Sequence, residues 1–504
     1  MAASGTTTGG KPVFTDGYKR LVLGLLLGAY TFNFIDRTII STIGEAIKVD
    51  LKITDTQLGL LGGLYFALLY TFLGIPIARL AERFSRVNII AFAIAIWSGF
   101  TALCGTAHSF VVLAAYRFGV GFGEAGLSPP AHSLISDYFE PKKRASALAV
   151  YSFGIPLGTM FGAVAGGWLA QNFSWRIAFV LVGAPGLLMA LAIKWLIKEP
   201  PRGHSEPEPH PALAEDVVAE THEPVSPKFS LANEFREMAA VAAILFGKWP
   251  VVNMVLGVTI ASFAGYGAGQ FVPPYFIRTF GLNYAQVGLI TGLVGGFSAG
   301  LGTLVGGFLT DRLSKRSPRW YALTPAFGLA IATPIYVLAY TQNSWQTAAL
   351  ILLVPGIFHY TYLGPTFGVV QNMVDTRRRA TATALLFFFL NLLALGGGPP
   401  FTGWLIDQFA QYNFNNPGHD GVFSALGGLF QGDGAFTAAC PGGKAAEGAA
   451  AALAEQCHSA SKLATRQGIV ITVLFYLWAA FHYFLGSIGL VKALAEARAA
   501  RGEV

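Results

Sequence analysis

Four charged residues lie within long apolar stretches in the first half of the sequence: Asp36, Arg37, Arg117 and Glu124. Carboxylates can bind and release protons, and guanidinium groups hold phosphate or carboxylate groups through paired hydrogen bonds. A charge inside a membrane-spanning helix costs roughly 2.5–3.5 kcal/mol on insertion scales, so each of these residues needs a partner or a function. Because the four charges sum to zero, we expect them to compensate one another in a buried site.

The spacing of Arg117 and Glu124 indicates how these residues meet. Seven positions place both on one face of a helix, about 10.5 Å apart along its axis. A residue from a facing helix must therefore lie between them, and Asp36 is the natural candidate. We hypothesise an Asp36–Arg117–Glu124 network that couples protonation to a conformational change, with Arg37 and the released Arg117 binding an anionic substrate group. The alternative is a static salt bridge that only orients two helices.

The composition indicates which elements hold these residues. Of the 504 residues, 12% are charged and 53% are hydrophobic, with 60 Gly and 40 Phe. A soluble globular chain has about 25% charged residues, and this chain has too few to cover the surface of a soluble protein of its size. The sequence therefore predicts an integral membrane protein of the all-α class.

Twelve runs in the sequence are candidates for membrane-spanning helices, because a bilayer core of ~30 Å requires about 20 apolar residues per helix. They are 19–43, 54–78, 88–107, 109–135, 144–170, 175–197, 251–277, 284–309, 320–340, 346–371, 380–407 and 466–491. A segment rich in Pro and acidic residues divides them into six and six.

This division predicts five regions. They are an N-terminal tail at 1–18, a six-helix bundle at 19–198, a linker at 199–250, a second bundle at 251–491 and a C-terminal tail at 492–504. The linker ends in a short amphipathic helix at 231–248. The second bundle includes an insert at 410–464 that is rich in Gly and Ala.

Lys and Arg in the short loops predict the orientation. The loops after the second, fourth, eighth and tenth runs hold thirteen of them, and the short loops after the first, third, fifth, seventh and ninth runs hold four, Lys48, Lys52, Arg176 and Arg278. We therefore expect both termini and the linker to lie in the cytoplasm and the insert to lie outside. The expected location is the inner (plasma) membrane of the cell. Because this distribution accounts for the net charge of +7, binding of nucleic acid is not expected.

The three cysteines differ in their surroundings. Cys440 and Cys457 are seventeen positions apart in the insert, and either a disulfide or two free thiols would fit an outside location. Cys104 lies inside the third apolar run and is expected to be a small packing residue. No metal-ligand spacing is present, so no metal is expected.

The two halves of the chain match each other at nearly constant offsets. Residues 142–147 (KKRASA) match 377–382 (RRRATA) at an offset of 235, and 167–169 match 403–405 (both GWL) at 236. These matches indicate a duplicated six-helix unit. Parallel repeats with a site at their seam, near the bilayer midplane, are typical of transporters that work by alternating access.

Two groups of motifs carry a family resemblance. Residues 307–316 (GFLTDRLSKR) resemble the loop signature of the major facilitator superfamily, and residues 78–86 (ARLAERFSR) are a weaker copy. Residues 33–37 (NFIDR) and 117–125 (RFGVGFGEA) are similar to segments of the spinster family. The resemblance implies a major facilitator fold and transport of lipid-like amphiphiles such as lysophospholipids or sphingosine phosphate. For bacterial relatives it implies that protons drive transport.

Charged residues in the two loop motifs are expected to form a gate at the cytoplasmic helix ends. By bridging neighbouring helices there, they would stabilise the outward-open state. The residues are Glu82, Arg83, Arg86, Asp311 and Arg312.

The second half lacks the charged pair of the first. The repeat offset places Leu352 at the position of Arg117 and His359 at that of Glu124. His359 could take up protons or could be a hydrogen-bonded structural histidine. The predicted substrate contacts of this half are His359, Tyr360, Asn391 and Gln270.

Glycines at 154, 158, 162 and 166 form a stripe on the fifth run. Small residues at this spacing let two helices approach closely, and we favour this interpretation over an antiporter motif. The direction of coupling therefore stays open.

Other classes of protein are less consistent with the sequence. An enzyme is not expected, because no H-E-x-x-H motif, no G-x-S-x-G with triad partners and no Walker loop is present. We expect no cofactor, a proton gradient as the energy source, and a monomer in contact with membrane lipids. The expected cargo is an amphiphile, with a small organic anion as the alternative; a channel is a further alternative.

Overall fold

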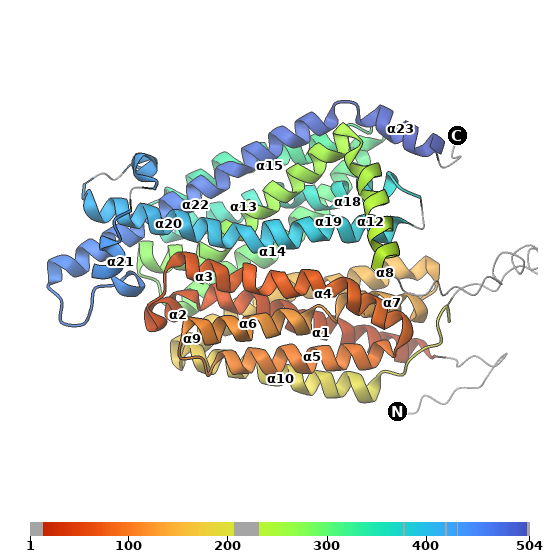
Figure 1. The fold of residues 1–504 in the computed structure, drawn as a ribbon, viewed down its shortest axis with the longest axis horizontal. Coiled ribbons are helices and arrows are strands. Elements are labelled where there is room, and N and C mark those ends of the chain that lie inside the picture. The colour runs from red at the N-terminus through yellow and green to blue at the C-terminus, as the bar shows by residue number, and fades with distance from the viewer. Residues whose placement is uncertain (1–13, 206–230, 376–377, 419–420, 431, 501–504) are drawn as a thin grey trace, which may run out of the picture.

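The computed structural model describes residues 14–205, 231–375, 378–418, 421–430 and 432–500, and this part of the chain contains helices and no strands. Two helical bundles lie side by side, with α1–α10 in one and α13–α23 in the other (Figure 1). We call them the N half and the C half. The predicted all-α class is confirmed.

The N half consists of ten helices. They are α1 (Asp16–Thr42), α2 (Gly44–Leu51), α3 (Asp55–Gly62), α4 (Leu64–Arg83), α5 (Arg86–Cys104), α6 (Phe110–Glu124), α7 (Ser128–Tyr138), α8 (Pro141–Ser152), α9 (Gly154–Asn172) and α10 (Trp175–Leu196).

A short helix, α12 (Leu231–Phe246), lies where the amphipathic helix was expected and precedes the C half. The helices of the C half are α13 (Trp249–Phe280), α14 (Tyr284–Ser314), α15 (Trp320–Tyr340), α16 (Trp345–Leu352), α17 (Pro355–His359), α18 (Leu363–Asn372), α19 (Arg379–Phe389), α20 (Gly396–Asn415), α21 (Ala435–Ala439), α22 (Ala451–Ser487) and α23 (Leu490–Ala500).

Eleven helical spans of the described residues are long and apolar enough to cross a membrane. They correspond to the second to twelfth predicted runs, several of which are divided into two or three helices. The first predicted run corresponds to α1, whose 27 residues are also long enough at about 1.5 Å per residue. It is less apolar because it carries Asp36 and Arg37.

The insert is shorter than the sequence indicated. α20 continues to Asn415 and α22 begins at Ala451, so 416–450 connect the two helices, where a break over 410–464 was expected. Hydropathy alone placed the end of α20 too early and the start of α22 too late, since the outer turns of both helices are polar and extend past their apolar segments. We call the end of the molecule with this connection and α2 the insert end (left in Figure 1), and the end where α1 begins and α23 ends the terminal end.

Prolines and glycines interrupt the long spans near the seam between the halves. Pro399 and Pro400 lack N–H groups, so the carbonyls of Leu395 and Gly396 lose their helical partners, and a π-helical segment (Leu390–Leu395) precedes α20. The Leu395 carbonyl lies against Gly63 of the N half, where an added Cβ would be 2.5 Å from the oxygen. These breaks allow the backbones of the two halves to touch.

Candidate functional site

A glycine stripe on α9 fixes the position of α1, the helix that carries Asp36 and Arg37. A Cβ added to Gly158 would lie 2.5 Å from the Thr31 carbonyl oxygen, and one added to Gly162 would lie 2.9 Å from the Ile35 Cα. The expected close helix packing is therefore confirmed. Because α1 is held backbone to backbone, its charged residues have little freedom to move away from α6.

Arg37 forms a direct ion pair with Glu124. Its Nε lies 2.6 Å from Glu124 Oε2; the Glu124 side chain is fully buried and that of Arg37 is 20% exposed. The guanidinium also lies over the rings of Phe34, Phe66 and Tyr70, at 5.1, 4.8 and 4.6 Å from their centroids. Cation–π contacts of this kind hold a charged group in a poorly solvated site. A substrate that reached Arg37 would therefore compete with Glu124.

Asp36 and Arg117 lie deeper in the N half. Asp36 is 2% exposed and Arg117 is 1% exposed, and Asp36 is within electrostatic range of both Arg117 and Glu124. Arg117 Nε donates to the Leu61 carbonyl oxygen at 3.2 Å. Among the described residues, Asp36 Oδ1 and Arg117 Nη1 have no hydrogen-bond partner. The four predicted residues therefore lie together. The arginine that pairs with Glu124 is Arg37, which was expected to contact the substrate, and not Arg117, as the hypothesis proposed.

His359 lies inside an aromatic cluster of the C half. It is 3% exposed, and its Nδ1 lies 3.3 Å from the Tyr336 hydroxyl and 3.5 Å from the Tyr476 hydroxyl. Its ring stacks on Tyr360 with 4.5 Å between centroids. Nε2 is buried without a partner in the described part of the chain. This arrangement fits the alternative in which His359 is a hydrogen-bonded structural histidine, although Nε2 is left without a hydrogen-bond partner among the described residues.

The other predicted residues of the C half are spread along the seam. Gln270 is 7% exposed and packs on Gly62 of the N half, where an added Cβ would be 2.4 Å from its Oε1. Asn391 lies half-buried in the π-helical segment. Tyr360 is within electrostatic range of Tyr266. The structure therefore does not gather these residues into one cluster.

Tyr266 was missed by the sequence analysis. It lies on α13, is 44% exposed and is within electrostatic range of Arg37 in the opposite half. The repeat offset would not have found it, because it marks only residues that correspond to a charged residue of the first half. A polar aromatic residue within an otherwise apolar run was the available signal.

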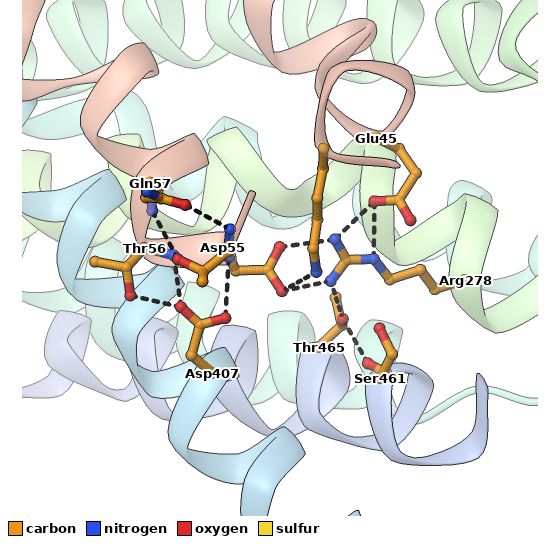
Figure 2. A network of polar contacts seen from close by, with 10 residues as sticks. Glu45, Asp55, Thr56, Gln57, Arg278, Asp407, Ser461 and Thr465 are labelled. Carbon is orange, nitrogen blue, oxygen red and sulfur yellow. Dashed lines mark hydrogen bonds and ion pairs between the residues drawn. The ribbon is translucent and has the colours of Figure 1, made fainter. Parts of the chain in front are cut away.

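A second polar network joins the two halves at the insert end (Figure 2). Arg278, at the end of α13, places Nη2 2.6 Å from Glu45 Oε2 and 2.7 Å from Asp55 Oδ1. Lys48 Nζ lies 2.7 Å from Asp55 Oδ2. The four residues are between 1% and 6% exposed. Because Arg278 belongs to the C half and its ion-pair partners Glu45 and Asp55 belong to the N half, the network stabilises contact between the halves here.

Asp407 of α20 extends this contact by capping a helix of the other half. Its carboxylate accepts from the backbone N–H groups of Asp55 and Thr56 at 2.9 and 2.8 Å and from the Thr56 hydroxyl at 2.6 Å. The N-terminus of α3 presents unpaired N–H groups and a partial positive charge, both of which favour a carboxylate. Figure 2 shows Asp407 below these groups and beside the Arg278 network.

This insert-end network (Glu45, Lys48, Asp55, Arg278 and Asp407) was not predicted. In the sequence, Lys48 and Arg278 indicated only the orientation of the chain in the membrane. A local signal existed at Thr54, whose side chain forms a capping box with Gln57 and marks the start of α3. No local pattern connects position 45 with position 278.

Two of the five residues of the predicted gate, Glu82 and Arg86, form ion pairs, and none of these pairs joins the two halves. Glu82 pairs with Arg79, one turn away on α4. Arg86 pairs with Asp137 and with Glu199, the latter at 2.6 Å. Arg83, Asp311 and Arg312 form no ion pair with any described residue. Arg86 thus bridges two neighbouring helices, α5 and α7, as expected, while no ion pair of these five residues with the other half is present in the described part of the chain.

A disulfide connects Cys440 to Cys457, so the structure has the bonded form of the two alternatives. It connects the turn Pro441–Gly443 to α22. An added Cβ on Gly442 would lie 2.9 Å from the Lys48 carbonyl oxygen, so this turn rests on α2 of the N half. The insert thus contributes to the contact between the halves. Cys104 is buried, as expected for a packing residue.

Comparison with known proteins defines the class of this protein. The model of the Major Facilitator Superfamily matches residues 26–399 and, a second time, 254–492. The chain is 32% identical over 392 residues to an MFS-type efflux pump of Mycolicibacterium smegmatis, covering 77% of this chain and 84% of that protein. It is 27% identical over 422 residues to the hexuronate transporter of Bacillus subtilis, covering 81% and 91%. The chain belongs to the Major Facilitator Superfamily.

A solved structure gives a more specific likeness. It is described as a bacterial homologue of the human lysosomal transporter spinster, in an inward-facing and unoccupied conformation. The two chains are 33% identical with a TM-score of 0.77, over 95% of this chain and 99% of that one. The predicted spinster resemblance is confirmed: this is an integral, multi-pass membrane transporter rather than an enzyme.

Proposed function

We propose that this transporter couples proton movement to the transport of a lipid-like amphiphile with an anionic head group. The observation that carries the proposal is the buried Arg37–Glu124 pair beside Asp36 and Arg117. Two acids and two arginines balance in charge in a site almost without solvent. Any proton or anion that enters must therefore change which groups pair.

Competition for Arg37 supplies the coupling. While Glu124 is ionised it holds the guanidinium at 2.6 Å. A proton on Glu124 removes that charge and leaves Arg37 to bind a phosphate or carboxylate of the substrate. Asp36 and Arg117 provide a second acid and base within electrostatic range, so a proton can be exchanged between two carboxylates as the halves rock.

The surroundings of Arg37 favour an amphiphile. Three aromatic rings surround the guanidinium, and the half-exposed Tyr266 lies opposite on α13. Such a site offers charge to a head group and apolar surface to a chain. The resemblance to the spinster homologue points in the same direction.

A small organic anion is the second candidate. The similarity to a hexuronate transporter favours it, since the same arginine would bind a carboxylate. The two cargoes differ in apolar content, so a direct competition experiment separates them.

The insert-end network supports an assignment of state. With both termini in the cytoplasm, as the loop charges predict, contact between the halves at the insert end corresponds to an inward-facing conformation. Transport would then require the Arg278 contacts with Glu45 and Asp55 to break in each cycle.

Reconstitution into vesicles with an imposed pH gradient tests the proposal. We expect uptake of a lysophospholipid that depends on the gradient, and we expect Asp36→Asn and Glu124→Gln to abolish that dependence. Glu447→Gln, which removes an exposed carboxylate of the insert, is the matched control and should transport as wild type.

Each alternative gives a different result. If Asp36→Asn keeps full pH-driven transport, the coupling proposal is wrong. If a hexuronate, and not the lysophospholipid, is transported and competes for the site, the cargo is a small anion. In either case Arg37→Gln should weaken substrate binding, because the guanidinium is the group that both cargoes would contact.

A further inference from the structure

A cavity of about 350 Å³ lies at the terminal end of the C half, away from the seam. It is formed where α14 and α18 end and α15 and α19 begin, and α23 covers one side. Polar and basic residues line most of it, among them Ser314, Lys315, Tyr321, Arg379 and Arg498. None of these residues belongs to the proposed transport site.

The cavity is positively charged and its charges are not compensated. Lys315, Arg379 and Arg498 line it, and no Asp or Glu does. None of the three forms an ion pair within the described part of the chain. Arg379 Nε is moreover buried without a hydrogen-bond partner there. A buried guanidinium nitrogen that lacks a partner costs free energy unless a ligand supplies an acceptor.

Three acidic residues of the surrounding elements are paired with other cations, and the exposed Asp311, one turn before Lys315, does not line the cavity. Glu496, on α23, forms an ion pair with Lys248, and the hydrogen bond from Lys248 lowers the pKa of Glu496. Asp375 and Glu237 both contact Arg378. Glu237, Asp375 and Glu496 are therefore engaged with other cations and do not balance the charge of the cavity.

We propose that this cavity binds the phosphate head group of an anionic phospholipid. Basic pockets between helix ends at a membrane surface bind such head groups. The cavity lies at the ends of membrane-spanning helices, next to Trp320 and Tyr321 at the start of α15, and these residue types are typical of the interface between lipid and water. Leu494 adds an apolar wall, and the exposed Ile488 and Val491 nearby would contact the acyl chains.

The bound lipid would hold α23 to the bundle. Arg498 is on α23, whereas Lys315 and Arg379 lie at the ends of α14 and α19, so one phosphate between them would connect α23 to these two helices. Because all three are in the C half, the lipid moves with that half and is not the transported cargo.

Lipid binding to the purified full-length protein tests the inference. The probes are phosphatidylglycerol, phosphatidylcholine and inorganic phosphate, and the readouts are retained lipid by native mass spectrometry and thermal stability in detergent. We expect phosphatidylglycerol alone to be retained and to raise the melting temperature. The Lys315→Gln/Arg379→Gln/Arg498→Gln variant should bind it roughly a hundredfold more weakly, at about fivefold per charge.

The matched control removes three exposed charges from the same loop and the same helix. Arg316→Gln/Arg319→Gln/Lys492→Gln leaves the lining of the cavity intact and should retain phosphatidylglycerol as wild type. If the cavity variant does not fold, Arg379→Gln alone should reduce binding about fivefold and Arg379→Lys should restore most of it. Equal loss in the control, or unchanged retention in the cavity variant, would overturn the proposal. So would protection by inorganic phosphate equal to that by the lipid, which would indicate a site for free phosphate.

Discussion

The two ends of this transporter use charged residues in opposite ways. At the insert end, Arg278 and Asp407 of the C half contact Glu45, Asp55 and Thr56 of the N half, and the ion-pairing groups of Arg278, Glu45 and Asp55 are buried. At the terminal end, Glu82 pairs with Arg79 and Arg86 pairs with Asp137, and all four residues belong to the N half. The same residue types therefore hold the halves together at one end and stabilise a single half at the other.

The difference shows that contact partners, not motifs, determine which end is closed. The loop signatures of the terminal end are conspicuous in the sequence, yet Glu82 pairs with Arg79 and Arg86 with Asp137 in the N half, and Arg83, Asp311 and Arg312 form no ion pair within the described residues. The insert-end network carries no signature, yet it supplies ion pairs between the halves. An alternating-access cycle must exchange these two situations, and each end can be perturbed separately.

The largest effect is expected from Arg278→Gln. It leaves Glu45 and Asp55 without their shared partner in a buried site, which costs about 3–5 kcal/mol in the state where the insert end is closed. The population should shift by roughly a hundredfold or more toward opening at that end. Spin labels at His108 and Asn343, exposed positions at the insert end with one in each half, report the opening. Double electron–electron resonance should show a longer distance between them than in the wild type.

Two controls accompany this measurement. Labels at Lys142 and Arg316 report on the terminal end and should move closer as the insert end opens. Arg278→Lys keeps the charge but not the forked geometry, so its shift should be intermediate. Unchanged distances at both ends in Arg278→Gln would show that the network does not hold the halves together.

A smaller effect is expected from Asp407→Ala. The substitution removes the cap that the C half provides to α3, worth about 1 kcal/mol, or roughly a fivefold shift toward opening of the insert end. Thr54→Ala is the matched variant, because Thr54 caps the same helix from within the N half. Both should lower thermal stability by a similar amount, measured by unfolding in detergent.

Only Asp407→Ala should change the distance between the insert-end labels. If Thr54→Ala opens the insert end equally, capping of α3 acts through helix stability, and the contact between halves has no separate role. This pair of variants therefore separates contact between the halves from local stability of the helix.

Sequence alone was sufficient for the spans and for part of the site. Apolar runs of fixed length identify membrane helices because the bilayer leaves few alternatives, and the cost of a buried charge marked Asp36, Arg37, Arg117 and Glu124 as residues that must meet. Which arginine pairs with Glu124 depends on rotations of α1 and α6, which the cost of burial does not determine.

The residues of the insert end show where such inference stops. Glu45 and Arg278 are far apart in the sequence and occupy helix ends, where charged residues are also common for reasons of solvation. Their pairing is a tertiary property, and it became evident only when α2 and α13 were placed side by side. The length of α22 was missed because its first turns are polar and largely exposed, so they lack the apolar run by which a membrane helix is found.

The smallest effect, and the most informative about the terminal end, is expected in the Arg278→Gln background. In that background the terminal end should close, so the predicted gate can form. Asp311→Asn should then reverse part of the shift, by roughly twofold, because exposed ion pairs contribute less than about 1 kcal/mol.

Arg86→Gln is the contrasting variant. It should lower thermal stability strongly, since Arg86 is buried against Asp137, and it should change neither label distance.

A double-mutant cycle decides between these roles. Asp311 acts as a gate residue only if its effect on the distances differs between the wild-type and Arg278→Gln backgrounds. Equal effects in both would place it with Arg86, as a residue that stabilises its own half. In that case the terminal end would close through apolar contacts such as the edge-to-face contact between Phe72 and Phe388, whose ring centroids already lie 6.0 Å apart across the seam. The charged motifs would then serve the folding of each half and not the cycle between them.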